Sequence, residues 1–388
     1  MQTIIDYLET EFASFEEKPF NPVDSLVLCA FCMVDLAHIA APLQEKPARH
    51  SLGSLWKSLR SGVPKSIRFK DVPHAELYPT MFTSPTPEKT KQLMFALAAS
   101  PRFRAMKIES YLSLLDEESH TQFCAMTFVY KRKFAYIGFR GTDSTLTGWR
   151  EDFDMAFTAP IPSQAQALHY VEALAPQLPP TLFLGGHSKG GNLAVYVALT
   201  AQDAVLGRVE RIYNHDGPGF KHGTFTPASY DLVRDRIDKT VPQDSLVGML
   251  MQSQEAYRVV HSSGRGIAQH DPFTWEISGD DFVCREALAD NARFTSEVIN
   301  EWLGSLPPDE LRIMTDTLFA TLMQSEDVHV AEVLSDWRQI LALVVGMGKD
   351  ADKPTAEVLG RAVGKLSNIA LKRFGEGIGT TVTGRVGT

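Results

Sequence analysis

The chain has 388 residues, of which 44% are hydrophobic and 22% are charged, and its formal net charge is −9. This composition is that of a globular protein able to bury a sizeable core, and it excludes a disordered chain or a coiled coil. The acidic balance also argues against sequence-independent nucleic-acid binding, because such binding needs a basic surface.

Features of the N-terminal segment and the cysteines indicate the compartment. Residues 1–20 are acidic and lack the basic region of a secretory signal, and no apolar run reaches the ~20 residues that span a bilayer. Cys29 and Cys32 form a C-x-x-C in an apolar stretch, without a second pair or a His partner, which favours a buried structural pair over a redox or zinc site. We therefore predict a cytoplasmic protein with reduced thiols, no transmembrane segment, no metal and no organic cofactor.

The predicted elements of the first 280 residues alternate between strands and helices. Asn21-Pro22 is typical of a helix start, and the irregular stretch 42–95 is a candidate lid or insertion. A short strand is expected within 103–111, and further strands at 123–130, 134–139, 181–184, 209–213, 237–241 and 257–261, with helices at 164–177 and 192–201 between them. The tight turn after residue 130 predicts an antiparallel hairpin, and the remaining alternation predicts a parallel sheet covered by helices on both faces.

The last hundred residues are predicted to be helical. Apolar positions recur at helical spacing in segments 285–304, 308–325, 329–346 and 354–374. The pattern divides the chain into an α/β domain over 1–305, a helical region over 306–374 and a Gly- and Thr-rich tail over 375–388 that is expected to be disordered.

A G-x-S-x-G pattern lies between a predicted strand and a predicted helix. In Gly186-His187-Ser188-Lys189-Gly190 the glycines allow a tight turn, and the following helix directs its positive N-terminal end at the serine. This context is that of a nucleophile elbow, so the sequence predicts an α/β-hydrolase fold with Ser188 as nucleophile. The alternative is a Gly-rich turn with an idle serine.

Partners for this serine can be proposed from the ends of the other strands. The Lys189 N–H and the Thr142 N–H, in Phe139-Arg140-Gly141-Thr142-Asp143, are the expected oxyanion donors. A base and an acid should follow the nucleophile in the order acid, then His. His270 is the preferred base, with His215, His222 and His261 as rivals; Asp244 is the preferred acid, with Asp216 and Asp271 as alternatives.

Several long motifs resemble one family. The segments "FAYIGFRGTDSTLTGWREDFDMAF", "GGHSKGGNLAVYVA", "IYNHDGPGF", "VPQDSLVGMLM" and "GIAQHDPFTW" occur in the order of the bacterial Mbeg-like family of unknown function, in the α/β-hydrolase superfamily. The resemblance covers roughly residues 19–345, and the core is more distantly similar to class 3 lipases. The resemblance implies the same roles for these residues of the chain: Ser188 as nucleophile, His270 as base, Asp244 as acid and Thr142 as oxyanion donor. The family varies at the position of Asp244. Lys189 stands where lipases carry a small or apolar residue, which implies a cation at the rim of the pocket. The alternative is a solvated lysine that pairs with a nearby carboxylate.

The function predicted from the sequence is that of a serine hydrolase. It would cleave a small-molecule or lipid ester, or a thioester, through a Ser188-His270-Asp244 triad and an acyl-enzyme, with Thr142 and Lys189 as oxyanion donors. The alternative is a catalytically silent hydrolase-like scaffold that binds a protein partner or a membrane surface. The helical region 306–374 motivates this alternative, because its apolar faces need a covering surface: this chain, another subunit or lipid.

Overall fold

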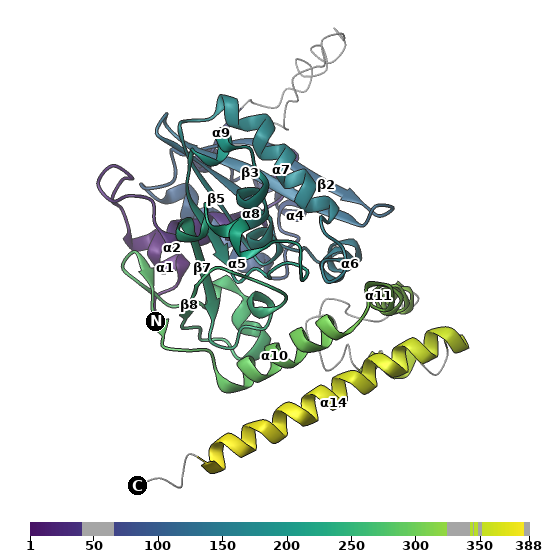
Figure 1. Ribbon diagram of the computed structural model, residues 1–388. Helices are drawn as coiled ribbons and strands as arrows, with labels where there is room; N and C mark the ends of the chain where they lie inside the picture. Colours follow the sequence, from purple (N-terminus) through teal and green to yellow (C-terminus); the bar gives the residue numbers. More distant parts are fainter. Residues whose placement is uncertain (41–65, 324–341, 344, 348–350, 384–388) are drawn as a thin grey trace.

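A mixed sheet forms the centre of the molecule in the computed structural model, which describes residues 1–40, 66–323, 342–343, 345–347 and 351–383 (Figure 1). In the described part of the chain this sheet has nine strands in the order β1-β2-β3-β4-β5-β6-β7-β8-β11. The strands are β1 (Ile67–Arg68), β2 (Lys107–Asp116), β3 (Thr121–Tyr130), β4 (Phe134–Phe139), β5 (Thr181–His187), β6 (Val209–His215), β7 (Ile237–Pro242), β8 (Tyr257–Val260) and β11 (Cys284–Arg285); β9 (Ile277–Ser278) and β10 (Asp281–Phe282) pair separately.

The register of the strands confirms the predicted hairpin and parallel sheet. Strands β3 and β4 pair antiparallel, with Tyr130 opposite Phe134, whereas β4 to β8 are all parallel to one another. The carboxyl ends of these parallel strands therefore meet at one edge, which is where ligands bind in open α/β sheets.

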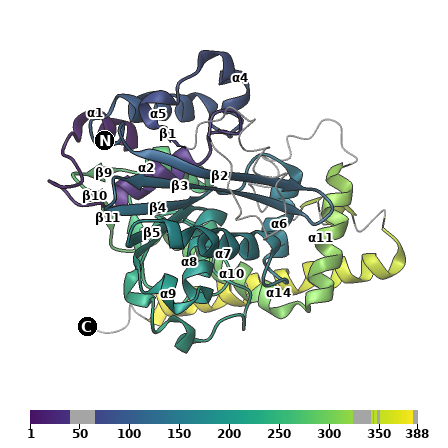
Figure 2. The ribbon, with the colours of Figure 1, turned by 90° about the horizontal axis from the view of Figure 1, so that it is seen from above.

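Helices cover both faces of the sheet, as Figure 2 shows. The α-helices are α1 (Ile4–Thr10), α2 (Pro22–Phe31), α4 (Tyr78–Met81), α5 (Pro87–Ala99), α6 (Leu146–Asp154), α7 (Pro162–Leu174), α8 (Lys189–Thr200), α9 (Asp203–Leu206), α10 (Asp290–Ser305), α11 (Pro308–Met323) and α14 (Lys353–Thr383). One hydrophobic core joins α1, α2 and α5 to the sheet, and a second joins α7 and α8 to its other face. This arrangement is the α/β-hydrolase fold that the sequence predicts.

Two predicted segments differ from the structure. Helix α5 occupies part of the candidate lid 42–95, yet its Leu93, Met94 and Leu97 are fully buried in the core, so this part belongs to the body of the domain. The first part of the stretch, 41–65, lies outside the described residues. At the other end, α14 continues to Thr383, into the tail expected to be disordered.

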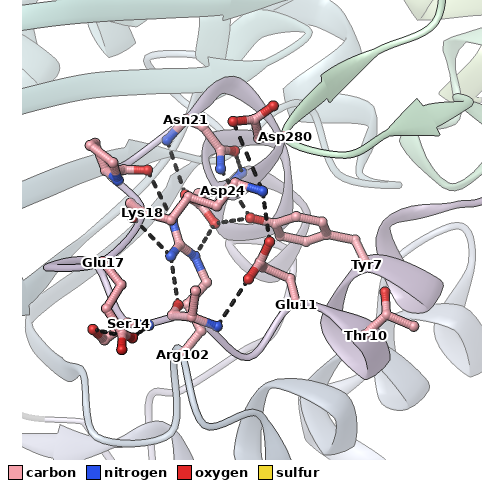
Figure 3. A network of polar contacts seen from close by, with 12 residues as sticks. Tyr7, Thr10, Glu11, Ser14, Glu17, Lys18, Asn21, Asp24, Arg102 and Asp280 are labelled. Atoms are coloured by element: carbon pink, nitrogen blue, oxygen red, sulfur yellow. Dashed lines mark hydrogen bonds and ion pairs between the residues drawn. The ribbon is translucent and has the colours of Figure 1, made fainter.

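A buried polar network connects the N-terminal segment to Arg102, between α5 and β2 (Figure 3). Arg102 binds Asp24 through two hydrogen bonds, Nε to Oδ1 at 2.8 Å and Nη2 to Oδ2 at 2.6 Å, and neither side chain is exposed. Arg102 Nη1 also donates to the Ala13 and Lys18 carbonyls, and Tyr7 Oη donates to Asp24 Oδ1. The pair is therefore fully hydrogen-bonded, the condition under which a buried ion pair is tolerated.

The apolar faces of the C-terminal helices pack on this same chain. A third hydrophobic core joins Leu318 and Phe319 of α11 to Trp149 and Phe153 of α6, and Trp302 of α10 donates from Nε1 to the Ala362 carbonyl of α14. Helix α11 consequently lies beside α6, and α14 runs along α10 (Figures 1 and 2). The segment predicted at 329–346 lies mostly outside the described residues. None of the described helices is long and apolar enough to cross a membrane.

Candidate active site

Ser188 lies on a sharp turn between β5 and α8. Its φ of 58° and ψ of −132° are in a region that non-glycine residues rarely adopt, and its backbone N–H donates to the His215 carbonyl at 2.9 Å. A Cβ atom at Gly186 would lie 2.1 Å from the Gly190 carbonyl carbon, so only glycine permits this approach of strand and helix. The turn has the strand-to-helix geometry that holds a nucleophile at the edge of an α/β-hydrolase sheet.

The segment after β4 in which an oxyanion donor is predicted, residues 139–143, lies directly against this turn and is called the oxyanion segment below. A Cβ atom at Gly141 would be 2.8 Å from the His187 carbonyl oxygen and 3.3 Å from Ser188 Cβ. Within the described ranges, neither the Thr142 N–H nor the Lys189 N–H donates a hydrogen bond to the protein. Two unused donors beside the serine are what an oxyanion hole requires.

His270 follows β8 and is oriented by a carboxylate. Its Nδ1 lies 2.6 Å from Oδ2 of Asp216, which is fully buried. The other oxygen of Asp216 accepts hydrogen bonds from Ser245 Oγ and the Gly248 N–H. Asp216 follows β6 directly with a φ of 52°, and this left-handed turn brings its side chain toward His270.

Asp244, the preferred acid in the sequence analysis, does not contact His270. Its Oδ2 accepts hydrogen bonds from Gln269 Nε2 at 2.7 Å and the Gly266 N–H at 3.2 Å, and its own N–H donates to Gln269 Oε1. Asp244 therefore holds the loop that carries His270, while the alternative of the sequence analysis, Asp216, is the carboxylate that contacts His270. The side chains of the rival histidines His215 and His261 bond Thr240 and Glu276, and neither hydrogen-bonds Asp216 or His270 in the described part of the chain.

The structure also corrects the expected environment of Lys189. Its side chain is buried and not at the rim of the pocket, because Nζ donates to Glu151 Oε2 at 2.9 Å and to the Gln122 carbonyl and side-chain oxygens at 2.9 and 2.8 Å. The alternative of a carboxylate partner is confirmed, but the pair is enclosed by protein and not by solvent. Lys189 thus brings no accessible cation to a substrate.

Two further residues of the site were missed in the sequence. His187 stacks on His270 with ring centroids 4.5 Å apart, and its Nε2 is 2.7 Å from the His270 carbonyl. Burial, and then the neighbouring His270, lower the pKa of His187 to about 3, so His187 is neutral and donates from Nε2. Its place beside the serine in G-x-S-x-G was the only sequence signal for such a role.

Asp152 is the second missed residue. Thr142 Oγ1 donates to Asp152 Oδ2 at 2.5 Å, and Asp152 Oδ1 is buried without a partner in the described part of the chain. Burial raises the pKa of Asp152 to about 6, although the nearby Lys189 opposes that shift. No group of His, Cys, Asp or Glu side chains among the described residues could hold a metal ion.

Comparisons with known proteins found a solved structure and a family that resemble this chain. The crystal structure of M37 lipase is similar to this chain with a TM-score of 0.31 and 12% sequence identity, over 58% of this chain and 69% of the lipase. No curated protein matches the sequence. The Mbeg1-like family matches residues 97–320, which carry the serine turn, the Thr142 loop, His270 and Asp216. This chain therefore belongs to the Mbeg1-like family.

Proposed function

We propose that the protein is a serine hydrolase that cleaves an ester or thioester through Ser188, His270 and Asp216. The observation that carries the proposal is the hydrogen bond between His270 Nδ1 and Asp216 Oδ2, beside a serine on a strand-to-helix turn. With Nδ1 bound to a carboxylate, the free Nε2 is the nitrogen that can accept the serine proton. In the described residues Ser188 Oγ makes no hydrogen bond, and such contacts often tighten only when substrate binds.

The proposed reaction proceeds in two halves. Ser188 Oγ attacks the carbonyl carbon while His270 Nε2 accepts its proton, and the Thr142 and Lys189 N–H groups stabilise the oxyanion. The intermediate then collapses, the C–O or C–S bond breaks, and His270 returns the proton to the leaving alcohol or thiol. His270 then accepts a proton from a water molecule that attacks the acyl-enzyme, and it returns this proton to Ser188 Oγ as the carboxylic acid leaves.

A fluorophosphonate probe tests this proposal directly. We expect the wild type to be labelled at Ser188, and we expect Ser188→Ala and His270→Ala to lose labelling while remaining folded. Ser144→Ala is a matched control, because Ser144 is exposed directly after the oxyanion segment and should leave labelling unchanged. A wild type that stays unlabelled, or a Ser188→Ala variant that still cleaves p-nitrophenyl esters, would refute the proposal.

A further inference from the structure

Lys189 is the residue in the site whose role the proposed reaction leaves unexplained. Its backbone N–H is one of the two proposed oxyanion donors, yet its side chain turns away from the substrate into a buried polar cluster. The cluster contains Gln122 of β3, Glu151 of α6 and Ser163 of α7. A lysine is costly to bury without a partner, so its presence here needs a physical reason.

The cluster connects the elements that carry the two donors. Helix α6 begins four residues after Thr142, and Glu151 on this helix accepts hydrogen bonds from Lys189 Nζ at 2.9 Å and from Ser163 Oγ at 2.7 Å. The start of α6 in turn touches the oxyanion segment, because a Cβ atom at Gly148 would lie 3.1 Å from Thr142 Cγ2 and 3.0 Å from Gln122 Oε1. A displacement of α6 would therefore move Thr142 relative to Ser188.

The backbones that carry the two donors also pack against each other directly, because a Cβ atom at Gly190 would lie 2.2 Å from the Phe139 carbonyl oxygen, and side-chain contacts add to this packing. Thr142 Oγ1 bonds Asp152, which is also on α6, so the side chain of Thr142 follows the same helix. The opposite side of α6 packs against α11 through Trp149 and Phe153. Lys189 to Glu151 is the ion pair that joins the first turn of α8 to α6 in the described part of the chain.

We infer that the Lys189–Glu151 ion pair sets the separation of the two oxyanion donors, so that Lys189 acts both as a donor through its backbone and as a positioning residue through its side chain. This inference rests on the proposed function. The pair touches no substrate, so its removal should weaken stabilisation of the transition state while leaving ground-state binding nearly unchanged. That pattern is a lower kcat at similar KM.

The test compares Lys189→Met with Lys239→Met in the full chain. Lys239 is a matched control, because its Nζ is equally buried and pairs with the buried Glu255 at 3.5 Å, without a contact to Ser188, Thr142 or His270 among the described residues. With p-nitrophenyl butyrate we expect Lys189→Met to lower kcat by about 10- to 100-fold, below the 10²–10³ for complete loss of one donor, and to change KM by less than about threefold. Lys239→Met should keep kcat within about threefold of the wild type.

The double variant Lys189→Met/Glu151→Gln covers the case in which Lys189→Met does not fold. It removes both charges, so we expect it to fold and to keep the low kcat. Wild-type kcat in a folded Lys189→Met or in the double variant would overturn the inference, as would an equal loss in Lys239→Met.

Hydrogen exchange separates this inference from the proposed function. The amides of 140–148 should exchange at least about tenfold faster in the Lys189 variants than in the wild type and in Lys239→Met. If the wild type neither reacts with fluorophosphonate nor cleaves the ester, the proposed function fails. Unchanged amide exchange over residues 140–148 in the Lys189 variants would refute the positioning role, whatever the activity of the wild type.

Discussion

The assignment of Asp216 as the acid can be tested by replacing a carboxylate with an amide of the same shape. In the wild type one oxygen of Asp216 accepts from Ser245 and Gly248, and the other faces His270. The Asp216→Asn variant keeps only one of these two oxygens. If this oxygen faces Ser245 and the Gly248 N–H, the amide NH₂ faces His270 Nδ1 and forces the proton onto Nε2. If the amide is rotated by half a turn, its oxygen faces His270, and its NH₂ group faces the Gly248 N–H, which is also a donor. The first arrangement removes the proposed base, and the second disrupts the hydrogen bonds that hold residue 216 in place.

The expected magnitude follows from the tautomer. Wrong placement of the imidazole proton in a Ser-His-Asp triad lowers kcat by about 10⁴, which corresponds to about 5 kcal/mol of activation free energy. Asp244→Asn is the matched comparison: its remaining oxygen can still accept from Gln269 Nε2 and the Gly266 N–H, so we expect a loss below about tenfold.

The assay is kcat for p-nitrophenyl butyrate between pH 6 and 9, with circular dichroism to verify that both variants are folded. A larger loss in Asp244→Asn than in Asp216→Asn would refute the geometric argument. So would an Asp216→Asn variant within about tenfold of the wild type, because the hydrogen bond at 2.6 Å would then not determine the tautomer.

Two further predictions concern stability, measured by urea denaturation. Arg102→Met should lower the free energy of unfolding by about 3–5 kcal/mol, because Asp24 stays buried without its cation. The double variant Asp24→Asn/Arg102→Met should recover part of this loss, and an unchanged denaturation midpoint in Arg102→Met would contradict the ion-pair argument. For His187, whose pKa is lowered to about 3 in the folded state against about 6.5 unfolded, the stabilisation is complete above pH 6.5 and is lost as the pH falls toward 3. Stability of the wild type should therefore fall more steeply below pH 6.5 than that of His187→Gln, by at most about 1.4 kcal/mol per pH unit, and parallel curves would exclude a neutral buried His187.

The parallel strands and the serine turn could be predicted because their signals are local. Apolar β-branched runs bounded by turn residues set β3 to β8, and the glycines around Ser188 fix the elbow within a few positions. The position and length of helix α5 were not predicted, because its Pro, Lys and Thr residues suggest an irregular stretch. Burial of Leu93 and Leu97 in the core decides its conformation.

The acid and the environment of Lys189 depend on contacts that sequence spacing does not reveal. Asp216 reaches His270 because the chain adopts a positive φ directly after β6 and because only β7 separates β6 from β8, which precedes His270. The sequence pattern favours Asp244 and leaves this residue only as an alternative. The Lys189 side chain is bound by residues that lie 38 and 67 positions away in the chain, Glu151 and Gln122. A lysine at a helix start is ordinarily solvated, so nothing local indicated burial.

The network around Arg102 also indicates which residues were inherited together with the family region. Similarity to the family begins at residue 97, yet Arg102, just inside that boundary, has its charge partner Asp24 and the Tyr7 hydroxyl well outside it. Loss of Asp24 or Arg102 alone leaves an uncompensated charge in the interior, so divergence at these two positions must be coupled. Relatives that keep the arginine should keep the aspartate, and this covariation would mark residues 1–40 as an inherited part of the α/β domain and not a later addition to it.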